Sequence, residues 1–129
     1  MNMLKRQETV DELVLQLRRK GFMTISRRFG KYLPDPKPIG KYQIDAVGRY
    51  KKDYAIGLNL TEDDFESVEI REKITFLANR HTKSSNKNVL LYLGVPSKFL
   101  TRAKSIVSDL DLFLQKNIRI IPLTISKLN

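Results

Sequence analysis

One aspartate, Asp45, falls within a segment whose pattern predicts a β-strand, Tyr42–Tyr50. Strands disfavour aspartate, because its short polar side chain competes for backbone hydrogen bonds and packs poorly on a pleated surface. Asp45 is therefore either an exposed residue that the strand tolerates or a functional group placed where a carboxylate is needed. The residue alone leaves both interpretations open.

The other residues that could do chemistry have ordinary structural interpretations. The acids of Glu62–Glu66 follow Thr61, and negative charge in a first helical turn complements the helix dipole. A catalytic acid among them is the alternative. His81 is the only histidine and the chain has no cysteine, so no second such ligand can share a zinc ion with it. The sequence has neither a glycine-rich phosphate loop nor a recognisable serine–histidine–acid pattern.

The hydrophobic pattern predicts eight elements in the order α-β-β-β-α-β-α-β. Thr9 and Glu12 form a capping-box pattern for the first helix, which Gly21 ends, and Thr61 begins the second helix. The expected helices cover residues 9–20, about 61–80 and about 97–115. The expected strands cover residues 22–26, 42–50, 54–60, 89–93 and 118–125.

This order predicts an α/β fold with a mixed sheet flanked by helices. The second and third strands form a hairpin within an antiparallel meander, and the helical connection to the fourth strand predicts a right-handed parallel crossover. Pro122 either confines the last strand to a sheet edge or ends it early. Because the chain contains no linker, repeat or low-complexity tract, residues 1–129 are expected to form a single domain.

The chain is strongly basic, with 24 Lys and Arg against 14 Asp and Glu and a net charge of +10. Such a field attracts polyanions, so we expect a nucleic-acid partner, DNA in the first place and RNA as the alternative. A protein that is merely basic would show the same charge. The candidate phosphate-binding residues are Arg18, Arg19, Arg27, Arg28 and Lys31, with Lys51 and Lys52 at the hairpin turn.

No segment predicts membrane association or secretion. The longest apolar run, Val89–Val95, is too short to span a bilayer, and the first residues lack the apolar centre of a signal peptide. No segment combines strong amphipathicity with exposed large aromatic residues. We therefore expect an intracellular, cytoplasmic protein that does not bind membranes.

The order of elements, with an acid in the second strand, resembles the restriction-endonuclease-like superfamily, whose motif is written PD-(D/E)XK. The resemblance covers roughly residues 8–95 and implies an acid and a lysine two residues apart on the third strand. The two carboxylates then hold Mg²⁺, and the lysine helps to position or activate water. Ile44-Asp45 matches the Pro-Asp of the motif, whereas Gly57 stands at the position of the acid and Asn59 at that of the lysine.

Within the superfamily, the segment Leu17–Phe22 looks nearest to the archaeal Holliday junction resolvases. That resemblance implies a homodimer and a catalytic glutamate on the first helix. The position of this glutamate aligns with Val10, and Glu12 lies nearby but out of register. Asp45 and Glu12 are therefore the candidate catalytic residues, and Asp45 is the candidate metal ligand.

The missing acid and lysine predict a protein that keeps the nuclease-like fold, binds DNA without cleaving it and needs no cofactor. One alternative is an active Mg²⁺-dependent endonuclease or junction resolvase that uses Asp45 with Glu12 or an acid of Glu62–Glu66. Another is a homo-oligomeric protein-interaction module. The aromatic residues considered for its interface, which are also candidates for the core, are Tyr42, Tyr50, Tyr54 and Phe65.

Overall fold

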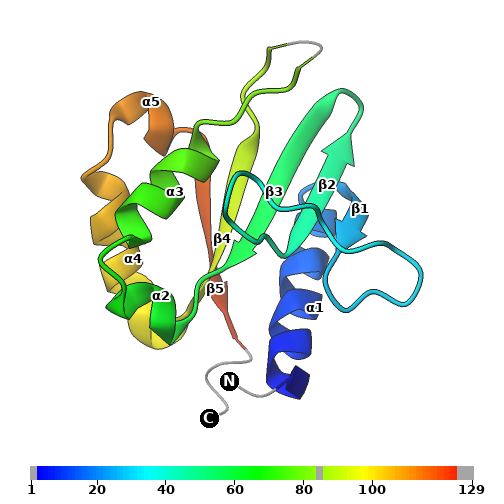
Figure 1. The fold of residues 1–129 in the computed structure, drawn as a ribbon, viewed down its shortest axis with the longest axis horizontal. Coiled ribbons are helices and arrows are strands. Elements are labelled where there is room, and N and C mark those ends of the chain that lie inside the picture. Colours follow the sequence, from blue (N-terminus) through cyan, green and yellow to red (C-terminus); the bar gives the residue numbers. More distant parts are fainter. Residues whose placement is uncertain (1–2, 84–85, 125–129) are drawn as a thin grey trace.

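A computed structural model describes residues 3–83 and 86–124 as a five-stranded mixed sheet with helices on both faces (Figure 1). The strands, in their order across the sheet, are β1 (Met23–Arg27), β2 (Ala46–Tyr50), β3 (Asp53–Asn59), β4 (Leu90–Pro96) and β5 (Ile118–Leu123). The first three strands pair antiparallel, and β3, β4 and β5 pair parallel. The predicted α/β class and the meander followed by a parallel crossover are confirmed.

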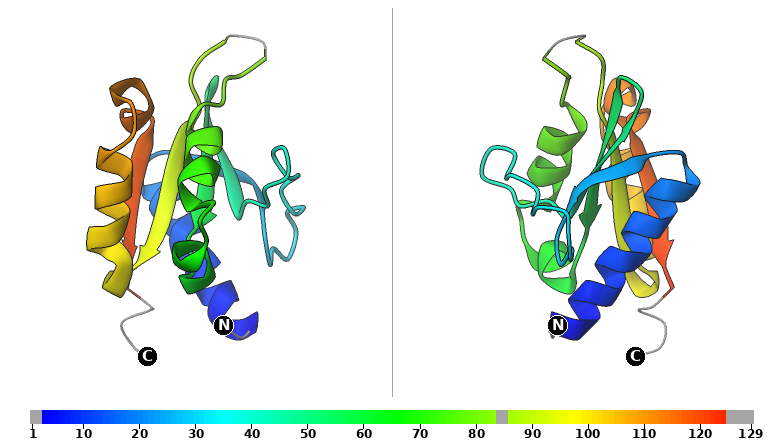
Figure 2. Two further views of the ribbon diagram at one scale, coloured as in Figure 1. Left: turned by 60° about the vertical axis from the view of Figure 1, so that its left-hand side comes forward. Right: turned by 90° about the vertical axis from the view of Figure 1, so that its right-hand side faces the viewer.

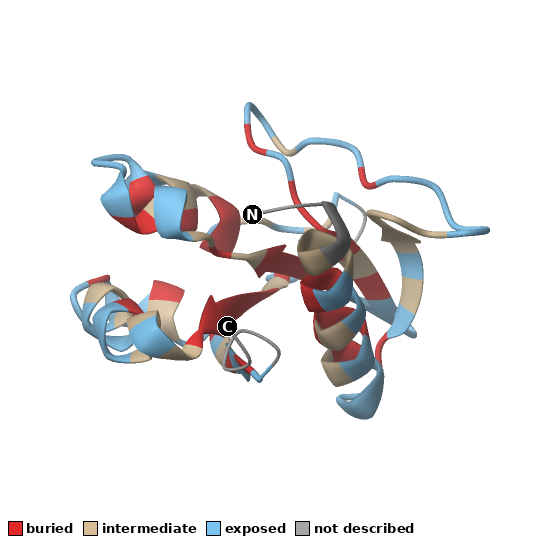
Figure 3. Ribbon diagram, turned by 90° about the horizontal axis from the view of Figure 1, so that it is seen from below, coloured by how far each residue is buried: buried red, intermediate tan, exposed pale blue. Residues whose placement is uncertain are grey.

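One helix, α1 (Met3–Arg19), covers one face of the sheet, and the remaining helices cover the other face (Figures 2 and 3). These are α2 (Glu62–Glu66), α3 (Ile70–Ala78), the 3₁₀ turn η1 (Ser97–Phe99), α4 (Leu100–Ser108) and α5 (Leu112–Gln115). Because side chains alternate along a strand, β3 contributes to two cores. Ala55 packs with α1, and Ile56 and Leu58 pack with the opposite helices.

The first helix begins six residues earlier than the capping pattern predicts. Thr9 is an interior helical residue, and its hydroxyl donates to the carbonyl of Arg6 at 2.9 Å instead of capping the helix. The preceding Lys, Arg, Gln and Glu are good helix formers, so the helix continues past the expected boundary. The predicted stop is confirmed, since Gly21 has a φ of 97°, a left-handed conformation that suits glycine.

The predicted strand Tyr42–Tyr50 is shorter than expected, and Asp45 immediately precedes β2 instead of lying inside it. Its backbone nevertheless extends both ladders by one residue. The Asp45 N–H donates to the Gly57 carbonyl at 2.9 Å, and the Asp45 carbonyl accepts from the Arg28 N–H at 2.9 Å. Asp45 is thus held at the end of the sheet by two neighbouring strands.

Two predicted helices are interrupted. The predicted helix start at Thr61 is confirmed, because Thr61 and Asp64 form a capping box in which each accepts a hydrogen bond from the other's backbone N–H. The helix stops at Ser67, which is extended with a φ of −83° and a ψ of 138°. Val68 is 98% exposed, so no apolar contact supports a helical turn there. The second interruption, at residues 109–111, separates α4 from α5.

The last two strands lie together at the far side of the sheet from β1. β4 runs three residues beyond its predicted end, through Gly94 to Pro96, and Pro122 lies in the edge strand β5 as predicted. No helix within the part of the chain that the structure describes is long and apolar enough to cross a bilayer.

Candidate functional site around Asp45

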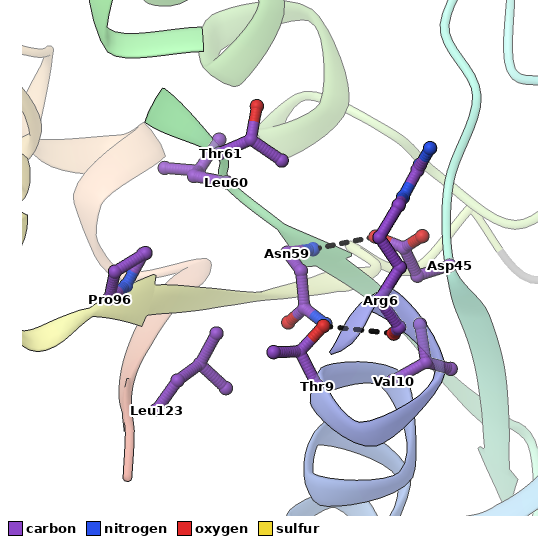
Figure 4. Close-up of a pocket in the computed structure, with 9 residues that line it drawn as sticks. All are labelled: Arg6, Thr9, Val10, Asp45, Asn59, Leu60, Thr61, Pro96 and Leu123. Atoms are coloured by element: carbon purple, nitrogen blue, oxygen red, sulfur yellow. Dashed lines mark hydrogen bonds between the residues drawn. The ribbon is translucent and has the colours of Figure 1, made fainter. Parts of the chain in front are cut away.

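A small pocket lies at the end of the sheet where the parallel strands finish and β2 begins (Figure 4). Its volume of about 30 Å³ has room for little more than one or two water molecules. The lining combines the first half of α1 with the ends of three strands. The lining residues are Arg6, Thr9, Val10, Asp45, Asn59, Leu60, Thr61, Pro96 and Leu123.

Asp45 is buried, with 7% of its surface exposed. One carboxylate oxygen accepts the backbone N–H of Asn59 at 2.7 Å, and the other lies 3.6 Å from a guanidinium nitrogen of Arg28. Burial raises the pKa of Asp45 above its ordinary value, while the Asn59 hydrogen bond and the positive charges of Arg28, Arg6 and Lys73 offset part of the rise. The carboxylate therefore has a cationic neighbour supplied by the chain itself.

Gly57 stands on the face of β3 that α1 covers, and the helix leaves no space for a side chain there. A Cβ at position 57 would lie 2.9 Å from Cδ2 of Leu13 and 3.2 Å from Cδ1 of Leu17. Both leucines are completely buried, so neither has solvent into which it can move. The position that the resemblance assigns to a catalytic acid is closed by the core.

Asn59 presents a buried side-chain amide. Within residues 3–83 and 86–124 neither of its polar atoms has a hydrogen-bond partner, and the side chain extends toward Thr9 of α1 (Figure 4). Asn59 is the register partner of Gly94, and a Cβ at position 94 would lie only 2.0 Å from the Asn59 side-chain oxygen. Gly94 therefore makes room for this amide, and the adjoining pocket is large enough to hold a water that could satisfy it.

The helix residues considered for catalysis lie in different places. Val10, which aligns with the catalytic glutamate of the resolvases, does line the pocket, but it is apolar. Glu12 does not line it: its carboxylate accepts hydrogen bonds from the backbone N–H and the hydroxyl of Thr124 at 2.8 and 2.7 Å. Among the acids that begin α2, Asp64 completes the capping box and pairs with Lys73 at 3.0 Å.

The residues around Asp45 do not fit a Mg²⁺ site. Mg²⁺ favours a shell of oxygen ligands that includes one or two carboxylates. Within residues 3–83 and 86–124, no three carboxylate, histidine or cysteine side chains come close enough together to hold a metal ion. The positive guanidinium beside Asp45 opposes a cation there, and the closed position at Gly57 leaves no space for a second carboxylate.

Two of the predicted phosphate-binding residues lie at the Asp45 end of the sheet and are engaged there. Arg27 pairs with Ala46 across the β1–β2 ladder, and its side chain forms an ion pair with Asp11. Only 16% of the Arg27 side chain is exposed, and 30% of that of Arg28, which lies beside Asp45. We therefore expect these two arginines to contribute less to phosphate binding than their charge suggests.

The other predicted residues are exposed, and most lie at the opposite end of β2. Met23, just after α1, pairs with Arg49, just before the hairpin turn, so the end of α1 and the turn share one end of the sheet. At about 3.3 Å per residue, the five residues of β2 separate the two ends by roughly 17 Å. The exposed candidates are Arg18, Arg19, Lys51 and Lys52 at this end and Lys31 in the loop after β1.

The aromatic residues considered for a protein interface divide between core and surface. Tyr42 and Phe65 belong to the larger core, and Tyr54 is partly buried against it. Tyr50 is half exposed, with Lys51 against its ring at 5.4 Å. The aromatic residues therefore form no shared apolar surface.

Gly94, Thr9 and Arg6 belong to the site, although no sequence pattern predicted their place in it. The only signal for Gly94 was a glycine at the end of an apolar run, and the strand register was needed to place it beside Asn59. Comparisons of the chain with protein-family models, curated proteins and solved structures gave no match.

Proposed function

We propose that this chain has a restriction-endonuclease-like fold, binds nucleic acid, principally DNA, and does not cleave it. The order of helices and strands and the strand pairing support this fold. So does the location of Asp45 at the end of the sheet, with Gly57 and Asn59 on neighbouring β3. Both match the arrangement that the resemblance implies.

The observation that carries the loss of cleavage is the packing at Gly57. A catalytic acid at this position would have to displace Leu13 and Leu17 from the core. Beside Asp45, the guanidinium of Arg28 supplies positive charge where the superfamily uses a metal ion. With one carboxylate, an asparagine at the position of the lysine and no space for a second acid, the site lacks the groups that hold Mg²⁺ and position water.

The binding is electrostatic in this proposal. The net charge of +10 attracts a polyanion, and five exposed basic residues, four at the hairpin end of β2 and Lys31 in the loop after β1, supply phosphate contacts. Each phosphate neutralised on duplex DNA contributes about −0.9 to the slope of log affinity against log salt, so five contacts give about −4.5.

Fluorescence anisotropy with a labelled duplex, measured over a series of salt concentrations, tests the proposal. We expect binding at low salt and a slope of about −4.5. Binding that does not change with salt, or no binding at low salt, would remove the proposal.

A further inference from the structure

The loop that follows β1 has a defined shape at its start. The Arg27 N–H donates to the Pro34 carbonyl at 2.9 Å and closes residues 27–34 into a compact turn. Inside it, Phe29 adopts a φ of 58° and packs against the α1 core. A Cβ at Gly30 would lie 3.0 Å from the Leu33 carbonyl oxygen, so a glycine allows the chain to fold back tightly.

This closure presents Lys31, Tyr32 and Leu33 outward, and these three residues form the tip of the loop. Tyr32 is 96% exposed, whereas the next most exposed aromatic residues, Phe113 and Tyr50, are 54% and 50% exposed. Lys31 is also exposed. No packing within the described structure accounts for a tyrosine at this position, because its ring contacts almost nothing.

The loop starts at the Asp45 end of the sheet, and Lys31 at its tip is the basic residue next to Tyr32 in the chain. Arg28 ties the start of the loop to Asp45 through its backbone N–H and its guanidinium. Figures 1 and 2 show part of the loop between β1 and β2 standing away from the sheet and the helices, whereas Ile39 and Tyr42, later in the loop, pack in the larger core. Later in the loop, Asp35 and Lys37 are exposed as well, and Lys41 pairs with Glu69. An exposed ring next to a lysine matches the stacking platforms of proteins that bind single strands.

We propose, on the basis of the proposed function, that Tyr32 stacks on an unpaired base of a single-stranded nucleic-acid segment while Lys31 contacts a neighbouring phosphate. A base inside a duplex already has a neighbour on each face, so the ring has access only where a base is unstacked. The tip therefore gives the protein a preference for single-stranded segments. The exposed apolar surface of Tyr32 and Leu33 is too small for stable insertion into a bilayer.

The chain contains no tryptophan, so Tyr32→Trp introduces a single fluorophore at the tip. We expect its emission to be quenched by a twelve-residue oligothymidylate and not by a duplex of equal length. Tyr32→Ala should bind the single strand about 5- to 100-fold more weakly and the duplex within about twofold of wild type. Tyr50→Ala, which removes a half-exposed tyrosine at the opposite end of β2, is the matched control and should show no selective loss for the single strand.

Each result has a distinct meaning. If both nucleic acids bind but Tyr32→Ala weakens neither, or weakens both equally, the stacking inference fails and the proposed function stands. If neither binds at low salt, both fail. A Tyr32→Trp emission that responds to phosphatidylserine vesicles and not to the oligothymidylate would also overturn the inference, in favour of a membrane contact.

Discussion

Replacing Gly57 by alanine tests whether α1 closes the position that the resemblance assigns to an acid. The new Cβ would lie 2.9 Å from Leu13 and 3.2 Å from Leu17, both completely buried. Inserting a methyl group into a full core costs about 1–3 kcal/mol. Gly57→Asp adds a carboxylate with no polar partner among the leucines, so its cost should exceed about 4 kcal/mol. That is a large part of the total stability of a typical domain.

Thermal and urea unfolding measure these costs. For a chain of this size, each 1 kcal/mol lowers the melting temperature by roughly 3–5 °C, so Gly57→Ala should lower it by about 3–15 °C. Leu13→Ala provides the control. Alone it should cost about 2–5 kcal/mol, but it also opens space for the new methyl group. The double variant should therefore be more stable than the sum of the single changes predicts, by at least about 1 kcal/mol.

The reasoning would be refuted by a Gly57→Asp protein that is as stable as wild type. A Gly57→Asp, Asn59→Lys double variant that folds and cleaves DNA in the presence of Mg²⁺ would also refute it. Such a protein would show that position 57 has enough space for an acidic side chain.

Three further changes test the site and the binding surface. Asp45→Asn should be at least as stable as wild type at about pH 7. Because folding raises the pKa of Asp45, the stability that this residue contributes is fully present below its unfolded pKa of 3.8. That stability is lost as the pH rises through the higher pKa of the folded state. Urea unfolding between about pH 3.5 and 7 should show the two proteins converging at low pH, and a wild type that gains on the variant as the pH rises would contradict this sign. Gly94→Ala should lower the free energy of unfolding by about 1–3 kcal/mol in wild type, because the new Cβ would lie 2.0 Å from the Asn59 side-chain oxygen. In a protein that already carries Asn59→Ala the loss should be much smaller, and equal losses in the two backgrounds would exclude that clash. Removing Lys51 and Lys52 together by alanine should make the salt slope less negative by about 1.8, and an unchanged slope would place the nucleic acid elsewhere.

Local signals predicted the parts of the fold that depend on a few neighbouring residues. Gly21 ends α1, and Thr61 with Asp64 caps α2, because each satisfies backbone groups within one turn. The start of α1 was predicted wrongly because threonine is a common N-cap residue. In the structure, the Thr9 hydroxyl instead donates to the carbonyl of Arg6, one turn earlier in the same helix. The break at Ser67–Glu69 was missed because the apolar spacing continues across it.

The candidate site was predicted in part. Asp45 was singled out by the strand pattern around it, which is a local property, and Gly57 and Asn59 by the resemblance, whose motif places two residues on one face of the third strand. The lack of space at Gly57 depends on how closely α1 approaches the sheet. The room for the unpaired side-chain amide of Asn59 depends on the parallel register that places Asn59 beside Gly94. Neither distance is encoded in a short stretch of sequence, so only the assembled fold could supply them.

The most direct test of the central claim is to follow the integrity of bound DNA. A labelled duplex and a labelled four-way junction would be saturated with wild-type protein at low salt and incubated with Mg²⁺ or Mn²⁺, with Asp45→Ala protein prepared in parallel to detect contaminating nuclease. We predict that the DNA stays bound and intact with both proteins. Metal-dependent products from the wild type that the Asp45→Ala protein does not give would contradict the account.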